Sequence, residues 1–152
     1  MSCPFIAAAR QIKESYAAYA FDESRLSGSL PGKLFFPTDT CQAAQALLMD
    51  SLAPITVSGG RTGIAGGCVP LAGENIISLE KLKIVPQVFY AEKSQSWSIC
   101  VGAGLPLSAL QQILLQKTYA WTDTKKPPAL FFPVDPTETT ATLGGMAATN
   151  AS

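Results

Sequence analysis

The feature that most restricts the fold of this chain is a glycine-rich loop in its first half. Residues 56–70 read TVSGGRTGIAGGCVP, and five of the nine residues from Gly59 to Gly67 are glycine. Glycine adopts positive φ easily and lets backbone N–H groups approach a ligand with no Cβ in between. A run of such N–H groups forms a concavity that binds anions such as phosphate or diphosphate. A tight strand-linking turn is the alternative, although a hairpin turn needs only one or two glycines.

Polar side chains accompany these glycines. Ser58 and Thr62 supply hydroxyl groups, and Arg61 supplies a cation. The loop lacks the Walker sequence GxxxxGK[ST]. The nearest match to the dinucleotide fingerprint GxGxxG is GAGLPL at 102–107, in which leucine replaces the third glycine. We interpret that stretch as a strand-to-helix turn, so a Rossmann nucleotide site is disfavoured.

A second stretch, at the other end of the sequence, has a related composition. Residues 131–152 read FFPVDPTETTATLGGMAATNAS, where prolines fix the backbone and threonines supply hydroxyls. We expect Gly144 and Gly145 to expose backbone N–H groups there. Uncharged donors in a rigid frame suit a large, partly apolar ligand with a phosphate in its middle. A polar surface loop is the alternative for this stretch taken alone.

Composition excludes several classes of function. The 152 residues contain no histidine, which rules out Ser-His-Asp and Cys-His catalysis and HExxH zinc sites within them. The four cysteines show no CxxC spacing, so we expect no metal site, and reduced thiols indicate a cytoplasmic chain. Lys and Arg total 11, as do Asp and Glu, with no basic stripe, so we expect no nucleic-acid partner. We also expect no signal peptide and no transmembrane segment.

Helical and strand patterns alternate along the chain, which predicts a mixed α and β fold. Asp39 and Gln42 are spaced as a capping box at the start of a predicted helix. Leu107 and Leu110, with Leu114, are predicted to face inward from another helix. The predicted helices are 4–20, 38–53 (with Ala44, Leu47, Leu48 and Leu52 at helical spacing) and 105–116, and the predicted strands are 34–37, 54–57, 75–79 and a hairpin over 86–101.

Together, the two glycine-bearing stretches resemble the FAD-binding domain of the vanillyl-alcohol oxidase / p-cresol methylhydroxylase family. That family shows a P-x-(S/T) strand end, a helix, a GGGTGLxGG-like loop, and later P-x-D…GG…A-T-N-A-G. The matching segments here, in the same order, are 37–39, 60–67 and 133–151. The most similar branch contains D-lactate dehydrogenases, the glycolate oxidase FAD subunit and D-2-hydroxyglutarate dehydrogenase. A related cell-wall reductase that acts on an enolpyruvyl sugar nucleotide shares the fold but fits these motifs less well.

The resemblance implies an α+β, two-subdomain PCMH-type FAD-binding fold, of which only the N-terminal part is present. The alanine-rich start of the chain predicts an N-terminal helix over 1–20, and the resemblance, which spans roughly residue 20 to the end, implies a truncated FAD-binding domain over 21–152. Within that domain we expect a βαβ-type subdomain at about 33–80 and a second, incomplete α+β subdomain at about 84–152. Relatives continue beyond the TNAS motif into a substrate domain that carries the catalytic residues, so we expect no catalytic residue here.

The resemblance also implies non-covalent FAD. Some relatives attach FAD through a histidine at the position of Arg61, and this sequence has none. Many dehydrogenases of the branch have glycine there; Arg61 either pairs with a phosphate or points into solvent. The cofactor-binding residues implied are Pro37, Ser58, Gly59, Gly60, Arg61, Thr62, Gly63, Gly66, Gly67, Pro133, Asp135, Thr142, Gly144, Gly145, Asn150 and Ser152.

The implied function is the FAD-binding portion of an oxidoreductase that oxidises a 2-hydroxy acid such as D-lactate or glycolate by hydride transfer to FAD, inactive by itself. The alternative is a non-enzymatic remnant without flavin that forms homo-oligomers through exposed apolar side chains. Candidate members of such a surface are Trp97, Trp121, Phe131 and Phe132, although for Trp97 a place in the core is favoured.

Overall fold

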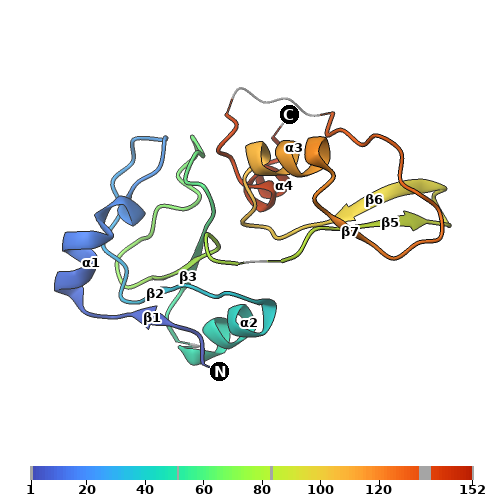
Figure 1. The fold of residues 1–152 in the computed structure, drawn as a ribbon. Helices are drawn as coiled ribbons and strands as arrows, with labels where there is room; N and C mark the ends of the chain where they lie inside the picture. The colour runs from blue at the N-terminus through green and yellow to red at the C-terminus, as the bar shows by residue number, and fades with distance from the viewer. Residues whose placement is uncertain (1, 51, 83, 134–137, 152) are drawn as a thin grey trace. The chain divides into compact units, whose positions relative to one another are not determined.

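The computed structural model describes residues 2–50, 52–82, 84–133 and 138–151. The chain divides into two compact units, Met1–Leu82 and Lys83–Ser152, each built around its own sheet (Figure 1). The predicted α+β class is confirmed.

The first unit contains a four-stranded sheet in the order β1-β2-β4-β3. β1 runs antiparallel to β2, whereas β2, β4 and β3 are parallel to one another, so their carboxyl ends lie along one edge. The elements of this unit are β1 (Phe5–Ile6), α1 (Ala9–Ser15), the 3-10 helix η1 (Ala17–Ala20), β2 (Leu34–Phe35), α2 (Thr40–Met49), β3 (Ile55–Ser58) and β4 (Asn75–Ser78).

The two central strands of this sheet, β2 and β4, are buried on both faces. Phe35 and Ile77 pack with Ala46 of α2 in one apolar cluster. Leu34 and Ile76 pack with Tyr19 and Phe36 in another. Neighbouring residues of a strand point to opposite faces, which explains why β2 and β4 are apolar at every central position.

The N-terminal segment differs from the single helix expected over residues 4–20. Phe5 and Ile6 form a strand that pairs with β2, and the helix begins only at Ala9. The pairing brings the Phe5 ring within 5.4 Å of the Phe35 ring, centroid to centroid. Tertiary pairing therefore overrides the helix propensity of an alanine-rich stretch.

Helix α2 begins as predicted, but its apolar residues lie differently. The Asp39 carboxylate accepts a hydrogen bond from the Gln42 backbone N–H at 2.8 Å, which confirms Asp39 as the N-cap. The Gln42 side chain accepts from the Thr38 N–H rather than closing a capping box on Asp39. Ala46 is buried, whereas Leu48 is 78% exposed and Leu52, beyond the helix, is 95% exposed. The apolar spacing of this segment does not mark a core face.

The second unit contains a three-stranded sheet in the order β6-β5-β7, with the predicted hairpin in register Val88↔Ile99 and Tyr90↔Trp97. The three leucines predicted to face inward from α3 are buried, and Trp97 packs against the core cluster around Val88, as predicted. The elements are β5 (Gln87–Ala91), β6 (Ser96–Cys100), α3 (Leu107–Gln116), β7 (Ala120–Trp121) and α4 (Leu143–Thr149).

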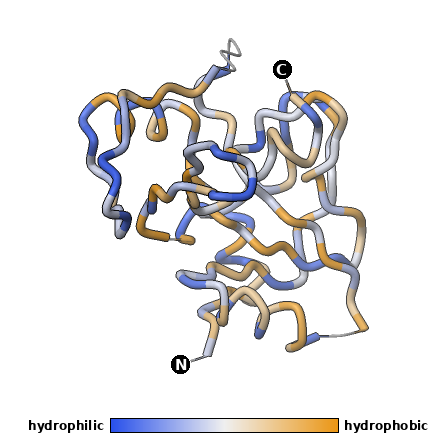
Figure 2. Tube along the Cα trace, turned by 90° about the vertical axis from the view of Figure 1, so that its right-hand side faces the viewer, coloured by the Kyte–Doolittle hydropathy of each residue, from blue (hydrophilic) through white to orange (hydrophobic). Residues whose placement is uncertain are grey.

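Apolar and polar residues are interspersed along both units (Figure 2). Among the described residues, the helices are too short or too polar to cross a bilayer.

Candidate anion-binding site at the glycine-rich loop

The glycine-rich loop leaves the sheet of the first unit at its carboxyl edge. β3 ends at Ser58, directly before the glycines, and its partner β4 ends at Ser78. The parallel strand β2 ends at the same edge and is followed by buried Pro37. In open sheets with parallel strands, ligands bind outside the carboxyl ends of the strands. The loop and Pro37, both predicted as cofactor contacts, therefore lie at the edge where such a ligand is expected.

The backbone of the loop keeps its hydrogen-bond donors available. In the part of the chain that the structure describes, none of the N–H groups of residues 59–67 donates to a protein acceptor. Gly66 adopts φ +74°, and its carbonyl accepts from the Val69 N–H at 3.1 Å, which closes the loop. A Cβ at Gly66 would lie 2.7 Å from Leu26 Cδ1. The positive φ therefore favours glycine at position 66, and a side chain there would also have to displace the end of the Leu26 side chain.

Ser58 carries an unsatisfied polar atom at the start of the loop. Its side chain is fully buried, and its Oγ has no hydrogen-bond partner among the described residues. A buried hydroxyl without a partner costs about 1–3 kcal/mol, and such groups are rare in native folds. The Ser58 hydroxyl directly precedes the loop whose N–H groups have no acceptor among the described residues, and such a set of donors suits an anionic ligand.

Arg61 lies against an aromatic ring, a contact that the sequence does not suggest. Its guanidinium carbon lies 4.3 Å from the centroid of the Tyr19 ring, and the residue is half-buried. The backbone has φ 59°, in the left-handed region that favours glycine. This conformation gives a physical reason for the glycine that many dehydrogenases of the branch have at this position.

The Tyr19 ring is fixed by polar contacts on its far end. Its hydroxyl is hydrogen bonded to Ser78 Oγ at 2.8 Å and donates to Glu80 Oε2 at 2.8 Å. Burial, together with the nearby Glu80 carboxylate, raises the pKa of Tyr19 to about 12. The sequence analysis missed Tyr19 and Glu80, because nothing in the sequence links a tyrosine of the expected N-terminal helix to position 61.

The segment before β2 packs along the other flank of the loop. The Cys68 thiol lies 3.7 Å from Asp22 Oδ2, and burial with this carboxylate raises the pKa of the thiol. Ser29 N–H donates to the Pro70 carbonyl at 2.9 Å. Gly28 has no room for a side chain, since a Cβ would lie 2.5 Å from that same carbonyl oxygen. These contacts hold the loop in place without using its N–H groups.

In the second unit, the predicted site residues mainly serve the fold. Gly144 and Gly145 lie in the first turn of α4, not in an open loop. The Gly144 N–H donates to the Ala103 carbonyl at 2.8 Å, and the Gly145 N–H donates to the Thr142 hydroxyl that caps the helix. Pro106 and Thr142 also form a β-bridge, and further backbone hydrogen bonds join residues 139–144 to the segment that contains the GAGLPL turn. The expectation that these two glycines expose N–H groups is wrong for this structure.

An apolar hollow lies in the second unit. It measures about 360 Å³, and Asn150 supplies its polar side chain. Asn150 has φ 50° and ends α4. Exposed Pro133 precedes the gap in the described residues, and predicted contacts Asp135 and Ser152 lie outside them. The hollow is lined by Ile99, Val101, Leu110, Phe132, Leu143, Met146, Ala147, Asn150 and Ala151.

The structure brings one group of the predicted cofactor residues together. These lie at the carboxyl edge of the first sheet and are Pro37, Ser58, Gly59, Gly60, Arg61, Thr62, Gly63, Gly66 and Gly67. The described members of the second group, Pro133, Thr142, Gly144, Gly145 and Asn150, belong to the other unit.

Comparisons with known proteins agree with this architecture. A D-lactate dehydrogenase of Anaerostipes hadrus is 32% identical over 114 residues, which cover 75% of this chain and 21% of the relative. A D-2-hydroxyglutarate dehydrogenase of Xanthomonas citri pv. viticola is 32% identical over 127 residues, covering 83% of this chain and 23% of the relative. The chain thus spans about a fifth of the length of the curated relatives it matches. No family model matches the sequence.

Solved structures show the same fold. An alkyldihydroxyacetonephosphate synthase superposes with a TM-score of 0.64 at 16% identity, over 95% of this chain and 26% of that protein. CrmK, a flavoenzyme of caerulomycin biosynthesis, superposes with a TM-score of 0.51 at 17% identity, over 77% and 22%. The predicted family is confirmed. The chain has the PCMH-type fold of FAD-binding proteins, and its sequence is similar to D-lactate and D-2-hydroxyglutarate dehydrogenases.

Proposed function

We propose that this chain binds FAD non-covalently through the diphosphate of the cofactor. The observation that carries the proposal is a run of donors at one edge of the first sheet that have no acceptor among the described residues. They are the N–H groups of residues 59–67 and the buried Ser58 hydroxyl. Several backbone donors around one concavity suit a group with two adjacent negative phosphates. Non-covalent binding follows from the absence of histidine in the sequence, since histidine is the attachment point in some relatives.

We further propose that the chain serves an oxidoreductase acting on a 2-hydroxy acid such as D-lactate or glycolate. Support comes from relatives named D-lactate and D-2-hydroxyglutarate dehydrogenase. Bound FAD would supply the hydride acceptor for the α-carbon of such an acid. The chain's own contribution is to hold the diphosphate and exclude water around it. We expect no turnover from the 152 residues alone, because they span a small part of the relatives and contain no histidine to take the substrate proton.

Binding is tested by absorption spectroscopy. The purified chain is mixed with FAD, desalted, and scanned for retained flavin absorbance. Riboflavin serves as the matched ligand, because it has the isoalloxazine ring but no diphosphate. Retention of FAD together with loss of riboflavin supports the diphosphate site. Equal retention of both would locate binding at the ring instead, and loss of both would reject FAD binding by this chain.

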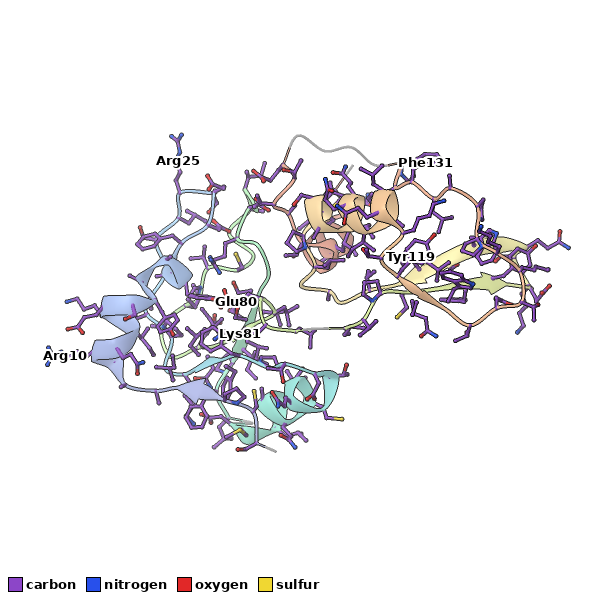
Figure 3. All side chains as sticks on the ribbon, viewed as in Figure 1. Arg10, Arg25, Glu80, Lys81, Tyr119 and Phe131 are labelled. Atoms are coloured by element: carbon purple, nitrogen blue, oxygen red, sulfur yellow. The ribbon has the colours of Figure 1, made fainter. Side chains whose placement is uncertain are left out.

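Exposed apolar side chains favour a second candidate, a non-enzymatic module that assembles with further copies of itself. Phe131 is 81% exposed and Trp121 48%, whereas Phe132 is half-buried and lines the hollow of its unit (Figure 3 labels Phe131). In the first unit, Leu52 is 95% exposed, Ile64 83% and Leu48 78%. A colourless chain whose molar mass by light scattering rises with concentration would support this candidate.

A further inference from the structure

Arg61 is held at the loop by a flat aromatic surface. Its guanidinium carbon stands 4.3 Å from the Tyr19 ring centroid, a close cation–π contact. In the described part of the chain, no carboxylate forms an ion pair with Arg61. A cation–π contact uses the charge of the guanidinium and needs no hydrogen-bond acceptor. The contact therefore holds the cation near the Tyr19 ring, and no described residue accepts a hydrogen bond from its N–H groups.

The Tyr19 ring is itself immobilised. It is 4% exposed and packs edge-on against Phe36, with centroids 6.1 Å apart. At its other end, the hydroxyl is bonded to Ser78, the last residue of β4, and to Glu80, two residues further along the chain (Figure 3). A hydroxyl that donates to a carboxylate also enriches its ring in electron density, which strengthens the attraction of a cation to the ring face. Glu80 thus supports the contact between Tyr19 and Arg61.

Arg61 also has an unfavourable backbone conformation. At φ 59° a residue with a Cβ is strained. The contact with the Tyr19 ring stabilises the side chain in this conformation. It also places a cation in a loop whose N–H groups have no protein acceptor among the described residues.

We propose, building on the diphosphate site above, that Tyr19 is a positioning residue for that site. Its ring holds the Arg61 guanidinium beside the glycine-rich loop, so that the cation is already in place when a diphosphate binds. Preorganisation of this kind raises affinity because the side chain has less freedom left to lose.

The test measures binding of inorganic pyrophosphate by calorimetry at several salt concentrations. Arg61→Gly removes the cation and relieves the strained backbone; it should weaken binding about tenfold and flatten the salt dependence, since one charged contact is lost. Tyr19→Leu should reproduce both effects, and the double variant should lose no more than either single one. Tyr19→Phe keeps the ring and should retain most of the affinity. Arg10→Ala, which removes an exposed cation of α1, is the charge-matched control and should change neither quantity.

A ring-current shift of the Arg61 Nε–H resonance provides a second measurement, on the unmutated chain. We expect this shift in the free protein and also after pyrophosphate is added. Its absence, or its disappearance on binding, would overturn the role of Tyr19 even if Tyr19→Leu fails to fold. Wild-type affinity and salt dependence in Tyr19→Leu, or additive losses in the double variant, would overturn it as well. An unmutated chain that binds neither pyrophosphate nor FAD would reject the diphosphate site itself, and the positioning role with it.

Discussion

Replacing Ser58 by alanine should stabilise the first unit while weakening its binding of a diphosphate. The Ser58 side chain is fully buried in β3, and its Oγ has no partner among the described residues. Alanine fills the same site without the oxygen, so the desolvation penalty of an unsatisfied hydroxyl, about 1–3 kcal/mol, is removed. For a unit of this size, each kcal/mol raises the melting temperature by roughly 4–8 °C.

The measurement combines calorimetric unfolding with pyrophosphate titration. Ser58→Ala should unfold at a higher temperature and bind pyrophosphate roughly tenfold more weakly, the effect of one hydrogen bond to a charged group. Ser78→Ala is the matched control, because Ser78 is the strand neighbour of Ser58 and is also fully buried. Its hydroxyl is bonded to the Tyr19 hydroxyl at 2.8 Å, so the same substitution should lower stability there.

The same substitution, serine to alanine, is thus predicted to raise stability at position 58 and to lower it at position 78. If Ser58→Ala leaves stability unchanged or lowers it, the Ser58 hydroxyl forms a hydrogen bond in the ligand-free protein and is not an unused donor for a ligand. If stability rises but pyrophosphate affinity is unaltered, Ser58 is an unsatisfied group with no part in binding. Either result would refute the reasoning that joins this residue to the loop.

Three further predictions test the fold and the site. Gly144→Ala should destabilise the second unit by about 1–3 kcal/mol, because the new Cβ would lie 2.8 Å from Ala103 Cβ. Gly145→Ala should be near neutral, because its Cβ would meet only the Thr142 hydroxyl, at 3.1 Å. Unfolding of both variants is followed by tryptophan fluorescence. The pKa of Tyr19, raised to about 12, predicts stability that is complete below pH 10 and falls as the pH rises towards 12; Tyr19→Phe should remove that slope in alkaline denaturation. Asp39→Ala should cost about 1 kcal/mol by removing the α2 cap, and Asp39→Asn should restore it in thermal unfolding.

The sequence predicts the regular parts of this fold well, where one local signal suffices. The hairpin of β5 and β6 and the inward leucines of α3 follow from periods of two and 3.6 residues, and both are confirmed. The prediction is wrong at Phe5, because strand pairing with Phe35 depends on a distant segment. It also fails for α4, whose two glycines suggest a loop. Gly144 is there because Ala103 leaves no room for a Cβ, a contact that no local pattern reveals.

In the candidate site, too, features set by local sequence can be predicted, whereas contacts between distant segments cannot. Glycine content alone locates the loop, since backbone N–H groups need no particular side chain, and the structure places that loop at the carboxyl edge of parallel strands. The environment of Arg61 depends instead on a tyrosine from η1 and a glutamate after β4, three segments that meet only in the folded chain. From the sequence, Arg61 had two possible surroundings, phosphate or solvent. The structure adds a third group, the Tyr19 ring, and an arginine that stacks on it is compatible with phosphate binding while its backbone occupies a conformation suited to glycine.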